Sequence, residues 1–281
     1  MLILAVTAAV LLLLLGNTAR NAGQWQPLRI TPDAALARLE PGWRLMLPPG
    51  PGPHRAAILL SGCDGVHDNM NYWARVMLDH GRAALILDSH GPRGLDRAQS
   101  WRAVCAAQVL TGAERAADIA VALQALASDP RLDATDVALL GASHGGWTAM
   151  EFLDLAAAGM APPPGLTDWP AAPAALLARI GPVILLYPYC GVMSGADDAR
   201  WPPGRAALMI LAERDRITDP LACQAMADRL NQGGAGIAVQ VIAGADHGFD
   251  QRERSALSPL EFVQVHTDAA TAAVGQLLDA R

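Results

Sequence analysis

The stretch LLGASHGGW, Leu139 to Trp147, places a serine between glycines directly after an apolar run. Gly141, Ser143 and Gly145 match G-x-S-x-G, the pattern of a sharp turn between a strand and a helix that presents a nucleophile. Such a turn strains the serine backbone, and side chains two positions away on either side would clash. The pattern predicts that Ser143 is a nucleophile at a strand end. A structural turn in a glycine-rich chain is the alternative.

Apolar runs of strand length alternate with helical segments on both sides of this turn. The runs are WRLML (43–47), RAAILLSG (55–62), AALILDSHG (83–91), DVALLGA (136–142), PVILLYPY (182–189), AALMILAE (206–213) and IAVQVIAG (237–244). Helical segments are predicted within 71–81, 112–130, 147–159, 220–230 and 267–278. This alternation predicts an α/β fold with a mostly parallel, doubly wound sheet and helices on both faces.

The composition excludes several classes of function. The chain has 281 residues and 52% hydrophobic residues, enough for one large domain. A net charge of −6 argues against a nucleic-acid partner, which would select a basic face. The sequence contains no lysine, which excludes Walker-type phosphate loops, lysine Schiff bases and Ser–Lys dyads. The sequence is compatible with a monomer or a dimer.

The first fifteen residues, MLILAVTAAVLLLLL, are apolar except for Thr7. At about 1.5 Å per helical residue they span roughly 22 Å, less than the ~30 Å hydrocarbon core of a membrane. This length is typical of the apolar part of a secretory signal. We expect residues 1–23 to be a signal peptide, or an anchor that tethers the chain to a membrane through residues 1–15. Residues 24–281 would then form a periplasmic or secreted domain. A buried first helix is the alternative.

Polar residues follow the predicted strands at the end where parallel sheets bind their ligands. Ser143, Asp215 and His247 each follow such a run, in that order. A near-neutral imidazole can take the serine proton and return it to a leaving group, and a carboxylate can orient the imidazole. We therefore predict a triad of these three residues. Glu213 and Asp219 are alternative carboxylates, and Asp219, directly before a proline, is more typical of a helix N-cap.

The loop LLSGCDGVHD, after the second apolar run, has glycines around Cys63 and Asp64 that free its backbone to bend. It is expected to supply the second N–H group of an oxyanion hole. Asp64, His67 and Asp68 have the side chains of metal ligands. Their spacing is not that of a metal site, and we interpret them as a polar loop that lines the cleft. We expect neither a metal nor a cofactor.

The proline-rich segment MAPPPGLTDWPAAPAALLARIG (160–181) interrupts the alternation. Its prolines end the preceding helix. The part between Pro162 and Pro173 is either a flap over the site or a plain surface connection.

Five segments together resemble the dienelactone hydrolase family of α/β-hydrolases: LLSGCDG, LDSHGPRG, GASHGG, LAERDRITDPLAC and GADHGFD. The resemblance extends from about residue 43 to the C-terminus and implies the α/β-hydrolase fold. It implies the same triad, with the oxyanion-hole N–H groups supplied by Cys63 and His144.

The sequence departs from this family in three places. Founding members carry a cysteine nucleophile, whereas position 143 is serine, and the dipeptide HG usual before the oxyanion loop is Ser61-Gly62. Family members hold a substrate carboxylate with two arginines. Arg93 matches the first, but Gln251 occupies the second position. Dienelactone is therefore not the expected substrate, while an anionic ester stays open. A structural pairing of Arg93 with a carboxylate such as Asp88 is the alternative.

Four cysteines are present, and none has CxxC spacing. Exported proteins similar to the family carry cysteines at positions like Cys190 and Cys223, so the resemblance implies that these two form a disulfide. Cys63 and Cys105 would form the other. Four buried thiols are the alternative.

These patterns favour a serine hydrolase that cleaves a small or medium carboxylic ester or lactone through an acyl-enzyme. Arg93, His90 and Trp147 are candidate substrate-binding residues. A peptidase or amidase of the same fold, and a non-catalytic binding protein that kept the fold, are the alternatives.

Overall fold

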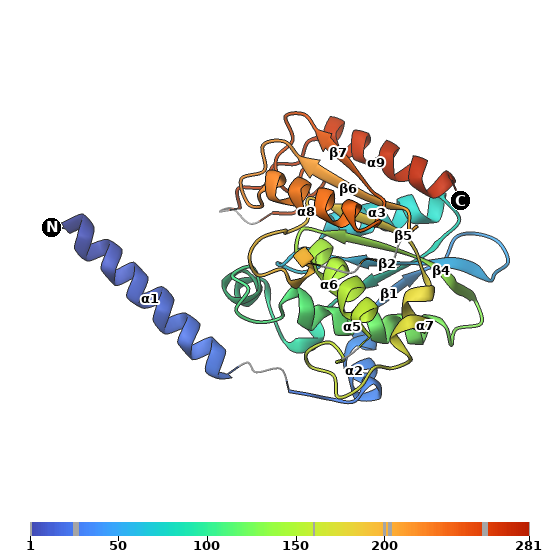
Figure 1. The fold of residues 1–281 in the computed structure, drawn as a ribbon, viewed down its shortest axis with the longest axis horizontal. Coiled ribbons are helices and arrows are strands. Elements are labelled where there is room, and N and C mark those ends of the chain that lie inside the picture. Colours follow the sequence, from blue (N-terminus) through green and yellow to red (C-terminus); the bar gives the residue numbers. More distant parts are fainter. Residues whose placement is uncertain are drawn as a thin grey trace.

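The computed structural model describes residues 2–24, 28–159, 161–198, 201, 204–254 and 258–280. Within them, seven strands form one sheet in the order β1-β3-β2-β4-β5-β6-β7 (Figure 1). Strand β1 pairs antiparallel with β3, and every other pair is parallel. The strands are β1 (Arg44–Met46), β2 (His54–Leu60), β3 (Ala83–Leu87), β4 (Leu132–Ala142), β5 (Ile180–Leu186), β6 (Ala207–Ala212) and β7 (Ile237–Ile242).

Helices cover both faces of this sheet. One hydrophobic core includes residues of α5, α6, α7 and α8, and a second core on the opposite face includes residues of α3 and α9. The helices are α1 (Leu2–Gln24), α2 (Pro32–Leu39), α3 (Asp68–Asp79), α4 (Arg97–Gln99), α5 (Gly112–Leu126), α6 (His144–Ala158), α7 (Pro173–Ala178), α8 (Pro220–Gln232) and α9 (Gln264–Asp279). The predicted doubly wound α/β sheet is confirmed.

Strand β2 shows why the apolar runs are continuous. Its side chains alternate between the two faces. Ala56, Ile58 and Leu60 join the core under α5 and α6, whereas Ala57 and Leu59 join the core under α3 and α9. Because helices cover both faces, every position from 56 to 60 is buried, and no polar alternation remains.

Several short elements were not predicted, among them α2, α7 and a π-helical turn. Helix α2 is capped by Thr31, whose hydroxyl accepts the N–H of Ala34, and α7 begins at Pro173. A π-helical turn, Ser100–Val104, follows α4. Each has fewer than nine residues, too few for a clear helical period, and tertiary packing holds them in place.

The segment after α6 is a surface connection. Leu166 is buried against Ala35, Ala117 and Val121, and residue 166 forms an isolated bridge with Ile30. These contacts hold the segment beside α2 and α5, and it does not line the cavity described below. The flap interpretation of the Pro162–Pro173 stretch is therefore wrong. Met160, where the segment was expected to begin, lies outside the described residues.

Helix α1 is separate from both cores. The side chains of residues 4–16 are all exposed, including Leu4 and Leu13, and Figure 1 shows the helix extending away from the sheet. The alternative of a buried first helix is therefore wrong. Among the described residues, no helix combines the length and apolarity needed to cross a membrane. Met1 lies outside the described residues.

The four cysteines form two disulfides, Cys63–Cys105 and Cys190–Cys223. The first joins the loop after β2 to Cys105, the residue that directly follows the π-helical turn. The second joins the loop after β5 to α8. Both predicted pairings are confirmed.

The Cys190–Cys223 disulfide closes a loop of 33 residues, which lowers the entropy of the unfolded chain. The double variant Cys190→Ser/Cys223→Ser is expected to lose about 3–4 kcal/mol of unfolding free energy. Urea unfolding of the oxidised proteins measures this loss. In reductant, which opens both disulfides, the wild type and the variant should be equally stable. Equal stability of the two oxidised proteins would contradict the prediction.

Candidate active site

Ser143 lies on a strained turn between β4 and α6. Its φ of 53° and ψ of −115° are in a region that side-chain-bearing residues rarely adopt. The turn is possible because of the flanking glycines. A Cβ on Gly145 would collide with the carbonyl groups of Leu60 and Ser61, and a Cβ on Gly141 would collide with the Gly145 backbone. The predicted strand-to-helix elbow is present.

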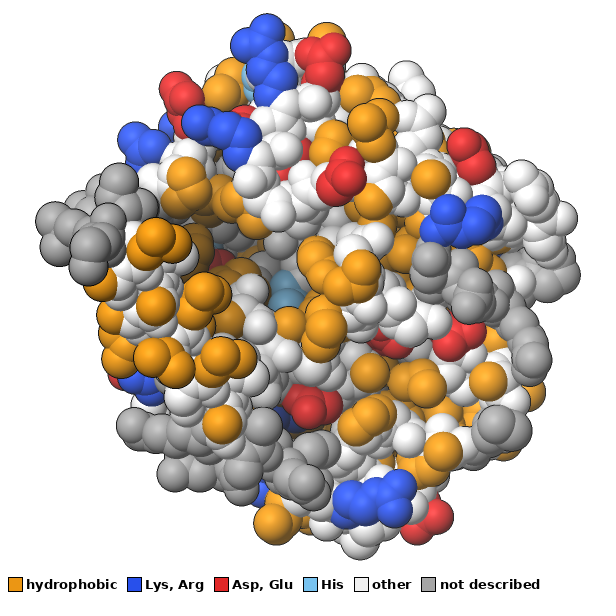
Figure 2. All heavy atoms as spheres, turned by 60° about the vertical axis from the view of Figure 1, so that its left-hand side comes forward, with side chains coloured by type: hydrophobic (Ala, Val, Ile, Leu, Met, Phe, Trp, Pro, Cys, Tyr) orange, Lys and Arg blue, Asp and Glu red, His pale blue; other side chains and the backbone are white. Residues whose placement is uncertain are grey.

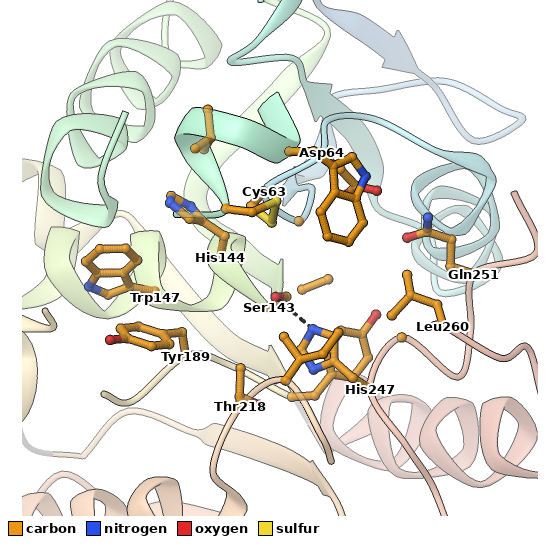
Figure 3. A pocket seen from close by; sticks show the side chains of 18 of the residues that line it. Cys63, Asp64, Ser143, His144, Trp147, Tyr189, Thr218, His247, Gln251 and Leu260 are labelled. Atoms are coloured by element: carbon orange, nitrogen blue, oxygen red, sulfur yellow. Dashed lines mark hydrogen bonds between the residues drawn. A yellow bond between two sulfur atoms is a disulfide. The ribbon is translucent and has the colours of Figure 1, made fainter. Parts of the chain in front are cut away.

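Three side chains from different loops meet at this turn. The Ser143 hydroxyl oxygen lies 2.9 Å from Nε2 of His247, and Nδ1 of His247 lies 2.8 Å from Oδ2 of Asp215 (Figure 3 shows the first contact). The loops after β4, β6 and β7 bring these residues together. The structure therefore places the predicted triad residues in a continuous hydrogen-bonded chain.

Asp215 is held by its own loop. Its carboxylate accepts the N–H groups of Ile217 and Thr218 and the Thr218 hydroxyl, at 2.7 to 2.9 Å. Burial raises the pKa of Asp215, but the hydrogen bond and charge of His247 and these N–H donors outweigh burial and keep the pKa below its ordinary value. Asp215 is thus an ionised acceptor for the imidazole.

The two alternative carboxylates have other partners. Glu213 accepts the N–H of Gly244 at 2.7 Å. Asp219 accepts the N–H of Leu221 at 2.9 Å as the N-cap of α8, as its position before a proline predicted.

Two backbone segments flank the serine where an oxyanion would form. His144 is the first residue of α6, where the helix itself provides no acceptor for the N–H group and the helix dipole favours negative charge. Cys63 follows β2 and lines the same cavity as Ser143. The structure thus brings both predicted oxyanion residues beside the serine (Figure 3).

A buried polar cluster behind His247 was not predicted. The Tyr187 ring packs edge-on against the His247 ring, with centroids 4.8 Å apart. The Tyr187 hydroxyl donates to Asp250 at 2.5 Å, and Trp73 donates to the same carboxylate at 2.6 Å. Burial raises the pKa of Asp250. The cluster fixes the position of the imidazole. Asp250 is the last residue of the GADHGFD segment that carries His247, and this position was the one sequence feature that pointed to it.

The triad opens into a cavity of about 440 Å³. Figure 2 shows a hollow with hydrophobic side chains around it and a histidine at its floor. In Figure 3, Trp147 and Tyr189 lie on one side of Ser143, and Gln251 and Leu260 on the other. The remaining walls include Trp101, Val104, Ala106, Ala107, Met193, Ile217 and Pro259. Trp147 is therefore in the cavity wall, and its contact with a substrate stays a prediction.

Arg93 and His90 do not line this cavity. The Arg93 guanidinium makes two hydrogen bonds to the Asp118 carboxylate, at 2.9 and 2.7 Å, and a third to the Ser89 carbonyl. His90 is buried, with Nε2 3.0 Å from the Cys63 carbonyl. Both side chains therefore bond to other parts of the protein, and their interpretation as substrate contacts is wrong for this cavity. Arg93 pairs with Asp118, and not with Asp88.

Of the polar residues in the loop after β2, some line the cavity and others do not. Asp64 lines the cavity and lies 2.9 Å from Nε2 of His67. Burial raises the pKa of Asp64, but the hydrogen bond and charge of His67 outweigh burial and lower it overall. Asp68 instead accepts the N–H groups of Arg252 and Glu253. Among the described residues, no group of three or more His, Cys, Asp or Glu side chains could hold a metal ion.

No protein-family model matches the chain, and no curated protein matches its sequence. Solved structures do resemble it. A dienelactone hydrolase-like promiscuous phosphotriesterase from metagenomic libraries superposes with a TM-score of 0.59 at 18% identity, over 85% of this chain and 91% of that chain. The propionate-bound esterase 2 of Thermogutta terrifontis gives 0.59 at 13% identity, over 85% and 88%. The same esterase phosphorylated by paraoxon gives 0.60 at 14% identity, over 84% and 87%. At these identities the similarity shows the fold, so the chain has the α/β-hydrolase fold of dienelactone hydrolase-like proteins and esterases.

Proposed function

We propose that this protein is a serine hydrolase that cleaves small or medium carboxylic esters with an uncharged acyl group. The observation that carries the proposal is the hydrogen-bonded chain Ser143–His247–Asp215 at the floor of an apolar cavity. The esterase among the similar structures supports it.

In the proposed mechanism, His247 takes the proton of Ser143 as the serine oxygen attacks the ester carbonyl. Asp215 accepts the N–H at Nδ1 of His247 and stabilises the imidazolium. The N–H groups of Cys63 and His144 stabilise the oxyanion. His247 then protonates the leaving alcohol and activates the water that hydrolyses the acyl-enzyme.

The charges of the cavity favour an uncharged acyl group. Among the described residues that line the cavity, Asp64 is the only one that is an aspartate, glutamate, lysine or arginine. Arg93, the expected carboxylate ligand, is committed to Asp118. Gln251 lines the cavity at the position of the second arginine, while the neighbouring Arg252 lies over the ring of Phe262. A substrate carboxylate would thus meet Asp64 and no arginine among the described residues of the cavity wall.

The alternatives have less support. A non-catalytic binding protein would not require the three triad side chains to remain in hydrogen-bond contact. A peptidase or amidase would use the same triad, but the apolar walls provide few polar partners for a peptide backbone.

We also propose that the protein is exported. Two disulfides are typical of an oxidising compartment, and the apolar N-terminal segment fits a signal peptide or an anchor.

Reaction with paraoxon tests the proposed nucleophile. Because paraoxon phosphorylated the similar Thermogutta esterase, paraoxon is expected to phosphorylate Ser143 and to release about one p-nitrophenolate per chain. Release is measured by absorbance, and peptide mass spectrometry locates the diethylphosphoryl group. Ser143→Ala should give neither signal.

The matched control is Ser89→Ala, which removes a buried serine at the end of another strand. This variant should react like the wild type. A wild-type protein that does not react, or a Ser143→Ala protein that does, would contradict the proposed nucleophile.

The proposal also predicts a preference for an uncharged acyl group over a negatively charged one. Wild-type kcat/KM should be about tenfold or more higher for p-nitrophenyl butyrate than for p-nitrophenyl hemisuccinate, because Asp64 repels the second carboxylate by about 1.4 kcal/mol or more. The isosteric Asp64→Asn variant should narrow this ratio. A wild type that prefers the hemisuccinate would contradict the uncharged acyl group.

A further inference from the structure

Arg115 lies beneath both segments that the proposed function assigns to the oxyanion hole. It belongs to the first turn of α5, and it is 0% exposed. Its Nη1 donates to the Ser61 carbonyl at 3.1 Å and lies 3.0 Å from Nδ1 of His144. A single nitrogen atom thus joins the end of β2 to the start of α6.

The direction of the second contact follows from chemistry. Burial, and then the positive charge of Arg115, hold the pKa of His144 well below its usual value, so the ring is neutral. A guanidinium has no acceptor. Nδ1 of His144 therefore accepts from Arg115, and the ring hydrogen is on Nε2.

The position of the Ser61 carbonyl determines the position of the oxyanion loop. This carbonyl belongs to the peptide that leads into Gly62, and the N–H of Cys63 belongs to the next peptide. On the other side, the Ser61 carbonyl contacts the elbow because Gly145 has no Cβ. A shift of this carbonyl would move the Cys63 N–H relative to Ser143. Arg115 fixes the carbonyl from below.

Arg115 makes few hydrogen bonds for a fully buried cation. In the part of the chain that the structure describes, Nε and Nη2 of Arg115 have no hydrogen-bond partner. Asp118, one turn along α5, is already bound twice by Arg93. Burial lowers the pKa of Arg115 to about 10, which leaves it charged at neutral pH. Even a complete buried ion pair can often be replaced by apolar side chains with a neutral or stabilising effect.

We propose that Arg115 is a positioning residue that sets the spacing between the two oxyanion-hole N–H groups and places a positive charge beneath the oxyanion. It does not line the cavity, so it acts through Ser61 and His144 and not on the substrate. The inference rests on the proposed function.

The main test compares Arg115→Met with Arg82→Met. Arg82 is also buried, at 2% exposure, but it bonds to Ala56 and Asp136 at the opposite end of the sheet from the triad. Arg115→Met should lower kcat for p-nitrophenyl butyrate by about tenfold to hundredfold, less than the 10²–10³ typical of losing a whole oxyanion donor. KM should change less than about threefold, because the cavity walls are intact. Arg82→Met should keep the wild-type kcat.

A second readout reports the oxyanion itself. An alkyl trifluoromethyl ketone adds to the serine and forms an oxyanion, whereas the matched alkyl alcohol does not. The inhibition constant of the ketone should rise in Arg115→Met by the same factor as kcat falls. The inhibition constant of the alcohol should stay unchanged.

Two variants of the partner residue keep the test decisive if Arg115→Met does not fold. His144→Leu removes the acceptor for Arg115 but keeps the backbone N–H. His144→Gln retains a side-chain oxygen that can accept from a guanidinium. The leucine variant should lose kcat and ketone affinity, and the glutamine variant should recover most of both.

The outcomes separate the two proposals. A wild type without esterase activity would contradict the proposed function and this inference with it. An active wild type, together with Arg115→Met or His144→Leu variants that retain kcat and ketone affinity, would overturn only the role of Arg115.

Discussion

The close contact between the start of α6 and the end of β2 is the constraint on which the rest of the site depends. Gly145 packs directly on the carbonyl groups of Leu60 and Ser61, which any larger residue would displace. This contact sets Ser143 against the loop that contains Cys63. The strained φ of Ser143 follows from it, because the chain must turn sharply to enter α6 while touching β2.

The two disulfides hold in place the parts of the cavity wall that lie outside the sheet and the long helices. Cys105 directly follows the π-helical turn that contains Trp101, and Trp101 and Ala106 line the cavity. The bond from Cys105 to Cys63 ties this part of the wall to the oxyanion loop. Another part of the wall includes Tyr189, which adjoins the second disulfide. The first part is a short π-helical turn and the second is a loop, so the covalent links limit their movement.

Much of the architecture was predictable because strands buried on two faces produce uninterrupted apolar runs and parallel sheets collect polar residues at one edge. Ser143, Asp215 and His247 were located on these grounds. The structural role of Arg93 could not be predicted in this way. Its partner Asp118 lies on α5, and the helical period predicts which positions of a helix are buried but not which residues they contact. The π-helical turn and Arg115 escaped prediction for a similar reason, since tertiary packing alone brings them to the site.

The central claim is that Ser143 forms a covalent acyl intermediate, and trapping that intermediate tests it most directly. A slowly deacylating p-nitrophenyl ester can be mixed with the enzyme, quenched in acid within milliseconds and analysed by peptide mass spectrometry. The account predicts a burst of p-nitrophenol matched by one acyl group on the peptide that contains Ser143. Turnover of the ester with no acyl group on Ser143, or with the acyl group on another residue, would contradict it.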